Sequence, residues 1–529
     1  MQHALKSFTL GALGLLMAGS VWGQKCTVDI SPEFKTNGDK YLWNHLYSDA
    51  TGHYVLFVEE NQGFFLYKKF TPTLQKFDRA FNLSLDKEIP VEGSDIRFDN
   101  MLYARQKFVL CTRRDDKKAK KVTLTATTVG LDGATQLSKQ VASIPYDNND
   151  NLVDLVRWKT SPDTSSLVLA AWADNGDKKL PIKLMVSVQD NKLANLWNQF
   201  FTLPYTQDLV EIEDVVVSNT GQVLVSAKVY ADKKDKKAAR EKGAPAPPDH
   251  KMVVFALDGS SDKVREINPE VPGKFVMDLS ISVNRQEEFY YGVIYTNDGE
   301  GVIQGVFCAS LNAQTGDSKL LVNRELSDAE IKSFSSDKDK SGNAGLDPNF
   351  EMKNLLIQET GGLVLIAEET FKTYESYSSG GTLKTVTNYN TNDLLVVSIS
   401  PEGSVNWVKM VPKSQAFGET EKYSSYAYLT SGADLCFVYN DDKDNISQST
   451  SIKAKPISSF RDAVAGIFVI NGDGKMERQK VFSIKKDTGL LLVPERSKQI
   501  SANELFFVTT GVFKLTGKNM YHVGVIRVN

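Results

Sequence analysis

Acidic side chains at alternate positions open a segment that begins like a calcium-binding loop. Asp337, Asp339 and Ser341 would supply oxygen ligands, and Gly342 would allow the sharp turn that such loops need. The end of the segment departs from the pattern, because Pro348 stands where a bidentate glutamate is required. We therefore expect an ordinary polar link there, without calcium.

A second acidic group, formed by Asp441, Asp442, Asp444 and Asn445, offers oxygen ligands but also lacks the completing glutamate. The histidines after residue 23 are scattered and have no metal-ligand spacing. They are His45, His53, His250 and His522. The sequence therefore predicts no metal site, and each histidine is expected to have a surface or core role.

Local motifs for catalysis are missing from the sequence. It contains no serine-nucleophile elbow, no zinc-protease helix and no phosphate-binding glycine loop. Paired carboxylates for glycoside hydrolysis stay open, because they can come from distant parts of a chain and leave no local signature. We expect no cofactor, and we keep a hydrolase or lyase with central acidic residues as the alternative to a binding protein.

Three tyrosines are the candidate binding residues. Tyr374, Tyr377 and Tyr389 lie in a Tyr/Ser/Thr/Gly-rich stretch between Phe371 and Asp393. Tyrosine offers a large, stiff contact area with a polar tip, which suits recognition of a protein or a sugar surface. The same side chains can also pack back on the fold, and the sequence alone leaves both readings open.

The four cysteines are expected to be free thiols. Cys111, Cys308 and Cys436 each lie inside an apolar strand of a different repeat, where a thiol behaves as a small hydrophobic group. Cys26 stands near the amino terminus. Their number would permit disulfides in an oxidising compartment, but their spacing argues against pairing.

The composition is that of a soluble protein with a core, since 41% of the 529 residues are hydrophobic and 24% are charged. A net charge of −3 gives no strong field for nucleic acid or an anionic membrane. Residues 1–23 read as a signal peptide, because Lys6 precedes an uncharged apolar run and a cleavage site before Gln24 follows. We expect an exported protein, periplasmic or extracellular, without a transmembrane segment, with residues 24–529 forming one monomeric domain.

An internal repeat organises the rest of the chain. Each unit has a short first strand, a strongly apolar second strand, a hairpin, an apolar third strand and usually a more polar fourth strand. The eight second strands are expected at residues 54–58, 108–111, 167–171, 223–226, 289–293, 363–366, 435–438 and 505–508.

The middle strands are apolar at consecutive positions, so both faces of each sheet must be covered. Sheets stacked radially around a ring provide that cover. The sequence predicts an all-β β-propeller of eight four-stranded blades, with seven blades as the alternative. The last unit contains only three strands, and we expect residues 26–30 to supply the fourth and close the ring.

Residues 309–316 (ASLNAQTG) resemble the turn between the third and fourth strands of pyrroloquinoline-quinone-type repeats. Those repeats also build eight-bladed exported propellers, so the resemblance implies the same architecture. Leu320 and Leu321 stand where those repeats carry a tryptophan, and the chain has no vicinal cysteine pair. Quinone chemistry is not expected.

Long insertions fall in units four to seven, and all belong to the class of turns that emerges on one face of a propeller. Loops on a rigid scaffold commonly carry recognition. We expect a non-catalytic binding or scaffold propeller that recognises a protein or a glycan through the loops of this face.

Overall fold

The computed structural model describes residues 26–62, 68–91, 93, 95–146, 153–173, 177–234, 249–297, 302–334, 345–379, 382–418, 420–457, 462–513 and 518–529. The expected signal peptide, residues 1–23, lies outside the described residues. So does the calcium-like segment, residues 337–342.

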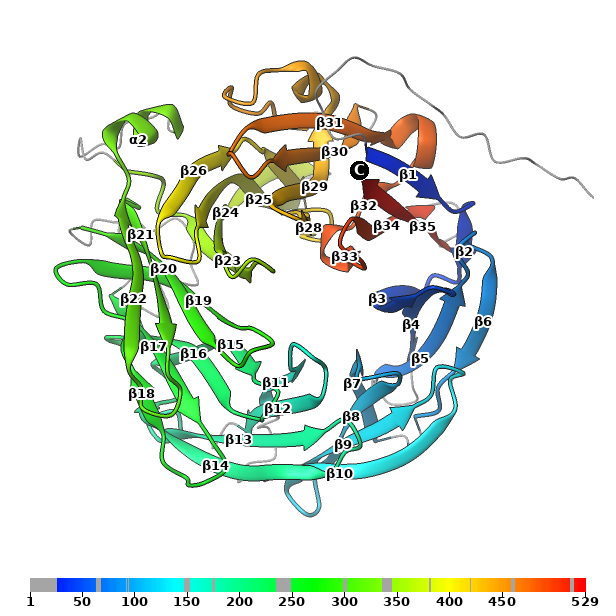
Figure 1. The fold of residues 1–529 in the computed structure, drawn as a ribbon. Coiled ribbons are helices and arrows are strands. Elements are labelled where there is room, and N and C mark those ends of the chain that lie inside the picture. The colour runs from blue at the N-terminus through cyan, green and yellow to red at the C-terminus, as the bar shows by residue number, and fades with distance from the viewer. Residues whose placement is uncertain are drawn as a thin grey trace, which may run out of the picture.

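Eight antiparallel sheets form a closed ring, so the protein is an eight-bladed β-propeller (Figure 1). The strands of blades one to four are β3 (Lys40–Asp49), β4 (Gly52–Gln62), β5 (Lys68–Phe77), β6 (Leu83–Glu88), β7 (Ile96–Tyr103), β8 (Phe108–Asp116), β9 (Lys121–Val129), β10 (Thr135–Pro145), β11 (Val153–Thr160), β12 (Ser166–Ala173), β13 (Pro181–Asp190), β14 (Asn195–Thr206), β15 (Val210–Val217), β16 (Val223–Tyr230), β17 (His250–Leu257) and β18 (Arg265–Ile267).

Blades five to eight follow the same order, with additions in the sixth and eighth. Their strands are β19 (Phe275–Val283), β20 (Phe289–Thr296), β21 (Gly305–Leu311), β22 (Ser318–Glu325), β23 (Phe350–Ile357), β24 (Leu363–Ser379), β25 (Thr382–Ile399), β26 (Val405–Val411), β27 (Gln415–Gly418), β28 (Ala427–Ser431), β29 (Asp434–Asp442), β30 (Ala463–Ile470), β31 (Met476–Ser483), β32 (Leu491–Leu492), β33 (Lys498–Gln499), β34 (Glu504–Phe513), β35 (Lys518–Val528), β1 (Cys26–Ile30) and β2 (Phe34–Thr36).

The core lies between the blades, as the consecutive apolar positions predict. Every residue of β30 is buried, so both faces of that strand are covered. Neighbouring blades share their cores, because Val186 of blade three and Val225 of blade four belong to one cluster of fully buried side chains. The eight second strands all form at the expected positions.

The amino-terminal strand closes the ring, as expected. β1 pairs with β35 from Cys26 opposite Val528 to Ile30 opposite Gly524. The Arg527 guanidinium forms an ion pair with Asp29 on β1 and contacts Glu504 on β34. The eighth blade thus combines both ends of the described chain, and closure leaves no unpaired edge on β35.

Helical turns are few in the described part of the chain. α2 (Asp328–Phe334) begins with a capping box, in which Glu330 accepts a hydrogen bond from the Ser327 backbone N–H at 2.7 Å. The other turns are η1 (Lys443–Ser447), η2 (Ile484–Thr488) and η3 (Pro494–Arg496). Within the described residues, no helix has the length and apolar character needed to cross a membrane.

The quinone-repeat-like segment occupies the turn that the resemblance implied, between β21 and β22. The Asn312 N–H donates to the Asp317 carbonyl at 2.9 Å, and Gly316 adopts a φ of +83°. Cys111, Cys308 and Cys436 are buried in three different blades as free thiols.

Candidate functional site

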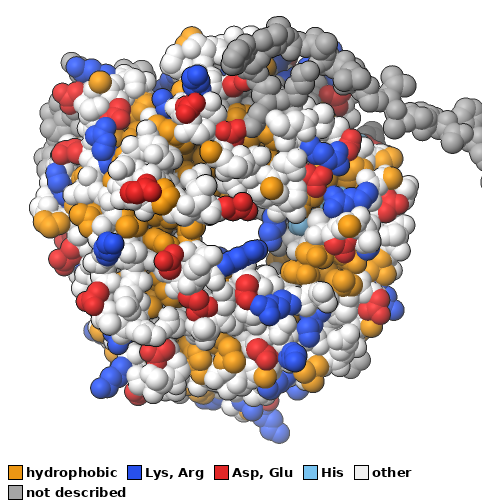
Figure 2. All heavy atoms as spheres, in the orientation of Figure 1, with side chains coloured by type: hydrophobic (Ala, Val, Ile, Leu, Met, Phe, Trp, Pro, Cys, Tyr) orange, Lys and Arg blue, Asp and Glu red, His pale blue; other side chains and the backbone are white. Residues whose placement is uncertain are grey.

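The innermost strands of the blades surround the central opening of the ring (Figure 1). Six of them contain a β-bulge, which adds one residue and re-aims the side chains that follow. The extra residues are Trp43 and Leu46 in β3, and Asp99, Asp154, Glu213, Met277 and Lys353 in the other five strands. Figure 2 shows charged side chains of both signs bordering the opening.

A charged cluster lies on the inner part of blades four and five. The Lys228 ammonium is 3.9 Å from a carboxylate oxygen of Glu213 and 3.9 Å from one of Asp278. The other oxygen of Asp278 accepts a hydrogen bond from the Met352 N–H at 2.9 Å, which ties blade five to blade six. Strands from three neighbouring blades therefore meet at this cluster: β15 and β16 of blade four, β19 of blade five and β23 of blade six.

Burial changes the acidity of two inner-strand carboxyl groups. Loss of hydration raises the pKa of Glu213 to about 7, against the opposing charge of Lys228 and with the support of Asp278, although 37% of its side chain stays exposed. Burial also raises the pKa of Asp99 to about 6, although Arg113 lies 3.0 Å away and opposes the change. A carboxyl group with a pKa near 7 is the kind of group that general acid catalysis uses.

The geometry of the cluster suits an ion pair better than glycoside hydrolysis. That reaction needs two carboxyl groups that face each other across the scissile bond. The Lys228 ammonium lies 3.9 Å from a carboxylate oxygen of each, so Glu213 and Asp278 share one cation. Asp99 belongs to another blade and has its own cation in Arg113.

The Tyr/Ser/Thr/Gly-rich stretch is a β-hairpin ribbon and not the loop that the sequence suggested. At its base β27 pairs with β25, from Thr391 opposite Gln415 to Asn388 opposite Gly418. β24 and β25 stay paired from Leu363 opposite Ile399 to Ser379 opposite Thr382. β23 accompanies β24 only as far as Glu369, so the rest of the hairpin extends beyond the blade. Threonine, tyrosine and valine favour extended strands, which explains the continuation.

The three candidate tyrosines do not share one face of this ribbon. Tyr374 lies opposite Thr387, and Tyr389 lies opposite Lys372, whose ammonium is 4.7 Å from the Tyr389 ring centre. By strand alternation these side chains are on one face, and Tyr377 is on the other. Leu383 belongs to the face of Tyr374. Tyr374 is 58% exposed, Tyr377 50% and Leu383 72%.

A buried ion pair anchors the base of the ribbon. The side chains of Lys413 and Glu368 are 0% and 1% exposed, and the ammonium lies 3.0 Å from the carboxylate. Lys413 also donates to the Thr391 carbonyl at 2.6 Å, while the Ser425 hydroxyl donates to Glu368 at 2.7 Å. Burial lowers the pKa of Lys413, and Glu368 opposes this by raising it. The ribbon is therefore joined to its blade through compensated charges.

The second acidic group has a structural role. Asp441 accepts hydrogen bonds from the Asn445 amide at 2.6 Å and the Asp442 N–H at 2.9 Å, and its other oxygen is 3.8 Å from Arg478. Asp444 pairs with Lys455 at 2.5 Å. In the part of the chain that the structure describes, no group of three His, Cys, Asp or Glu residues is placed to hold a metal ion.

The four histidines are all buried and hydrogen-bonded. His45 and His53 share the Ser48 hydroxyl, at 2.8 and 2.7 Å. His250 contacts the Met277 carbonyl at 3.0 Å, and His522 contacts the carbonyls of Ser31 and Thr488, the former at 2.8 Å. These positions agree with core roles.

Sequence reasoning missed the inner-strand acids and the anchor of the ribbon. The inner-strand acids did have a sequence signal, because an Asn or Asp follows the bulge in five inner strands. These residues are Asn44, Asn100, Asp214, Asp278 and Asn354. Lys413 had no such signal, since its partners Glu368 and Thr391 come from two other strands, β24 and β25.

No protein-family model and no curated protein sequence matches the chain. Solved structures that are similar to it include the polysaccharide lyase Uly1, with 11% identity, 94% of this chain and all of that chain covered, and a TM-score of 0.36. The quinohemoprotein alcohol dehydrogenase ADHIIG from Pseudomonas putida HK5 is 10% identical, and the match covers 93% of this chain and 77% of that chain with a TM-score of 0.38.

The β-propeller domain of the Trilobed protease from Pyrococcus furiosus is 8% identical, and the match covers 86% of this chain and 100% of that chain with a TM-score of 0.34. Likenesses at this level bring no activity and no ligand to the present chain.

Proposed function

We propose that the protein is an exported, non-catalytic binding propeller that docks a partner protein through the β24–β25 ribbon. One observation carries the proposal. Tyr374 and Leu383 stand 58% and 72% exposed on the same face of a paired ribbon that extends beyond its blade. Leu383 lies opposite Ser378, four residues along β24 from Tyr374, so the two exposed side chains are about 13 Å apart on one face and can contact the same partner.

The ribbon also favours binding because little of it has to become ordered. Its strands are paired along their length, and the buried pair of Lys413 and Glu368 fixes its base. Ordering of flexible segments is a main cost of association, so a preformed ribbon keeps more of its contact energy. Tyrosine adds contact area at low entropic cost.

The free edge of β24 offers a second mode of contact with the same partner. Within the described residues, no strand pairs with that edge beyond Thr370. An extended segment of a partner can add to such an edge through backbone hydrogen bonds. This favours a protein over a glycan as the ligand of the ribbon.

A hydrolase or lyase at the central opening is the second candidate, and the pKa of about 7 at Glu213 favours it. The Lys228 ammonium, 3.9 Å from both Glu213 and Asp278, speaks against it because both acids are paired with one cation. We rank the binding function first for that reason.

Photo-crosslinking tests the proposal. A benzophenone amino acid is placed at Tyr374, at Leu383 or, as a control of similar exposure (49%) on a distant blade, at Leu137. In the native envelope fraction we expect one common protein adduct at Tyr374 and Leu383 and none at Leu137. Purified wild-type protein should compete for this adduct, and a Tyr374→Ala, Leu383→Ser variant should not.

The same adduct at Leu137, or competition by the double variant, would contradict docking through the ribbon. Export is tested separately by the mass of the protein from that fraction. The chain should begin at Gln24, and an intact Met1 or a cytoplasmic protein would contradict the export proposal.

A further inference from the structure

Hydrogen bonds between neighbouring turns join the blades on the face opposite the ribbon. These turns connect the first and second strands of each blade. Arg105 forms an ion pair with Asp163 of the next blade, and the Asp163 N–H donates to the Asn219 amide oxygen at 3.2 Å. Asn219 in turn donates to the Arg285 carbonyl at 2.9 Å. The series thus runs from blade two to blade five.

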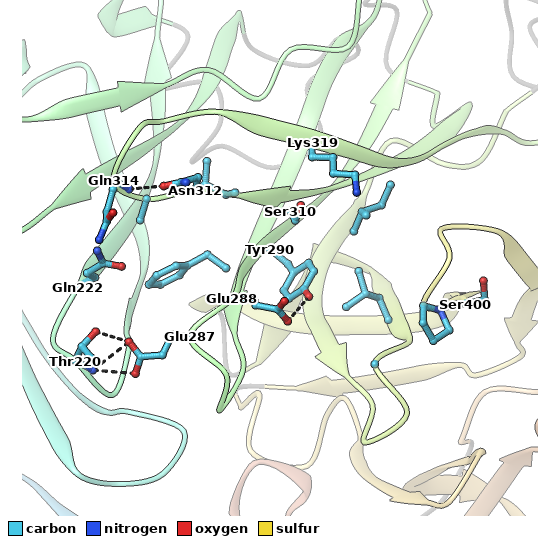
Figure 3. A pocket seen from close by; sticks show the side chains of 17 residues that line it. Thr220, Gln222, Glu287, Glu288, Tyr290, Ser310, Asn312, Gln314, Lys319 and Ser400 are labelled. Carbon is cyan, nitrogen blue, oxygen red and sulfur yellow. Dashed lines mark hydrogen bonds between the residues drawn. The ribbon is translucent and has the colours of Figure 1, made fainter.

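The series ends at blade five. Among the described residues, no hydrogen bond joins its turn to that of blade six at residues 358–362. A groove of about 730 Å³ opens here, across blade five and between the turns of blades four and six. Its volume lies within the roughly 300–1,000 Å³ range of small-molecule sites. Figure 3 shows Glu288 and Tyr290 near its centre, with Glu287 towards one end and Ser400 towards the other.

One end of the groove is held in a rarely populated backbone conformation. Glu287 has a φ of +69°, in the left-handed region that disfavours residues other than glycine and asparagine. Its carboxylate accepts hydrogen bonds from the Thr220 N–H at 3.0 Å and from the Thr220 hydroxyl. Gly221 and Gly361 occupy the same position in the turns of blades four and six, with φ of +92° and +86°, so the conformation belongs to this kind of turn, and the contacts with Thr220 fix the Glu287 side chain.

The centre of the groove presents an aromatic ring with a fixed orientation. Glu288 accepts a hydrogen bond from the Tyr290 hydroxyl at 2.9 Å and another from the Asn284 amide at 2.7 Å, both on the same oxygen. Within the described residues the second oxygen of Glu288 accepts no hydrogen bond, so it can take another donor. Leu311, Leu321 and Pro401 supply apolar lining.

Polar side chains with unused hydrogen-bonding capacity surround this ring. Gln222, Ser310 and Gln314 line the groove, and their side chains make no hydrogen bond within the described part of the chain. Amides and hydroxyls can each donate and accept. A sugar ring has the matching chemistry, since its hydroxyls do both while its C–H face packs on an aromatic ring.

We propose that the groove binds a neutral oligosaccharide. Glu287 and Glu288 bring two negative charges against the single positive charge of Lys319, so acidic polysaccharides are disfavoured. This site lies on the face opposite the ribbon and does not depend on the docking function proposed above.

The probes are cellotetraose, maltotetraose, xylotetraose and chitotetraose, titrated into the full chain and followed by calorimetry and saturation-transfer NMR. We expect at least one of them to bind with a Kd of about 0.1–1 mM, a usual range for a shallow site. The Gln222→Ala, Gln314→Ala double variant should weaken binding about tenfold, because two hydrogen bonds are lost. Ser310→Trp should block the groove.

Tyr374→Ala on the ribbon is the control and should leave the Kd unchanged. Equal melting temperatures would show that the groove variants fold. No binding of any of the four probes, or binding that the double variant and Ser310→Trp leave unaltered, would overturn the proposal. Tighter binding of tetragalacturonate than of the neutral probes would overturn the charge argument.

Discussion

Removal of the ammonium beneath the ribbon should destabilise the protein strongly. In Lys413→Met, Glu368 would remain buried at 1% side-chain exposure without the cation that now lies 3.0 Å away. Among the described residues, the Ser425 hydroxyl would be the one hydrogen-bond donor left to it. Breaking a buried pair by removal of one partner costs about 3–5 kcal/mol, because an uncompensated charge stays in the interior.

An exposed pair of nearly the same length gives the matched control. Lys159 and Asp214 are 3.1 Å apart with side chains 48% and 42% exposed. Solvent screens such a pair, so Lys159→Met should cost about 0–1 kcal/mol. The difference between the two variants therefore measures burial and not the removal of a lysine as such.

Urea unfolding, followed by circular dichroism and by tryptophan fluorescence, gives both free energies of unfolding. A Lys413→Met, Glu368→Leu double variant should be more stable than Lys413→Met, because it removes the stranded charge together with its partner. A cost below about 1 kcal/mol for Lys413→Met, or a double variant no more stable than the single one, would refute the reasoning.

Three further outcomes are expected. Burial lowers the pKa of His53 from 6.5 to about 4, so the folded state binds fewer protons than the unfolded state. The free energy of unfolding should therefore fall by up to about 3 kcal/mol as the pH drops from 6.5 to 4. Urea titrations at each pH should show a smaller loss for His53→Gln. Ser31→Ala should cost about 1–3 kcal/mol in unfolding free energy, since the buried Val523 N–H loses the hydroxyl that accepts from it at 3.0 Å. The raised pKa of Glu213 makes the folded state bind more protons than the unfolded state. The free energy of unfolding of the wild type should therefore fall relative to that of Glu213→Gln as the pH rises from 4.5 to 7. Parallel curves of unfolding free energy against pH for the two proteins would contradict this.

Much of the ring could be predicted because each blade repeats a local pattern. Consecutive apolar residues such as Leu167 to Ala171 require cover on both faces, and the structure buries all of them. The closing strand followed from a missing partner in the last unit. Its pairing from Cys26 opposite Val528 agrees with that reasoning. The positions of the strands follow from a short-range apolar pattern. The closing strand follows from the need to pair the exposed edge of the last blade. Both signals can be read from a sequence.

The ribbon was predicted as a loop because its residues are mostly polar. Hydrophobic alternation identifies a strand only when one face is buried, and the residues from Tyr374 to Tyr377 are exposed. Backbone preference gave the better signal, since Thr, Tyr and Val recur on both sides of the hairpin. The choice of Tyr374, Tyr377 and Tyr389 as binding residues stays a prediction, with the finding that Tyr377 lies on the other face.

The charged cluster near the central opening shows why a candidate site in a propeller resists prediction from motifs. Glu213, Lys228 and Asp278 are brought together by three strands of two blades, and the bulge at Glu213 sets which side chains share a face. A bulge has no strong sequence signal of its own. It recurs before an Asn or Asp in five of the inner strands, however, and that residue can hydrogen-bond the next backbone N–H, as Asp278 does to Leu279 at 2.9 Å. The position of such an Asn or Asp within each repeat therefore indicates the register of the inner strands, and with it the residues that neighbouring blades place side by side.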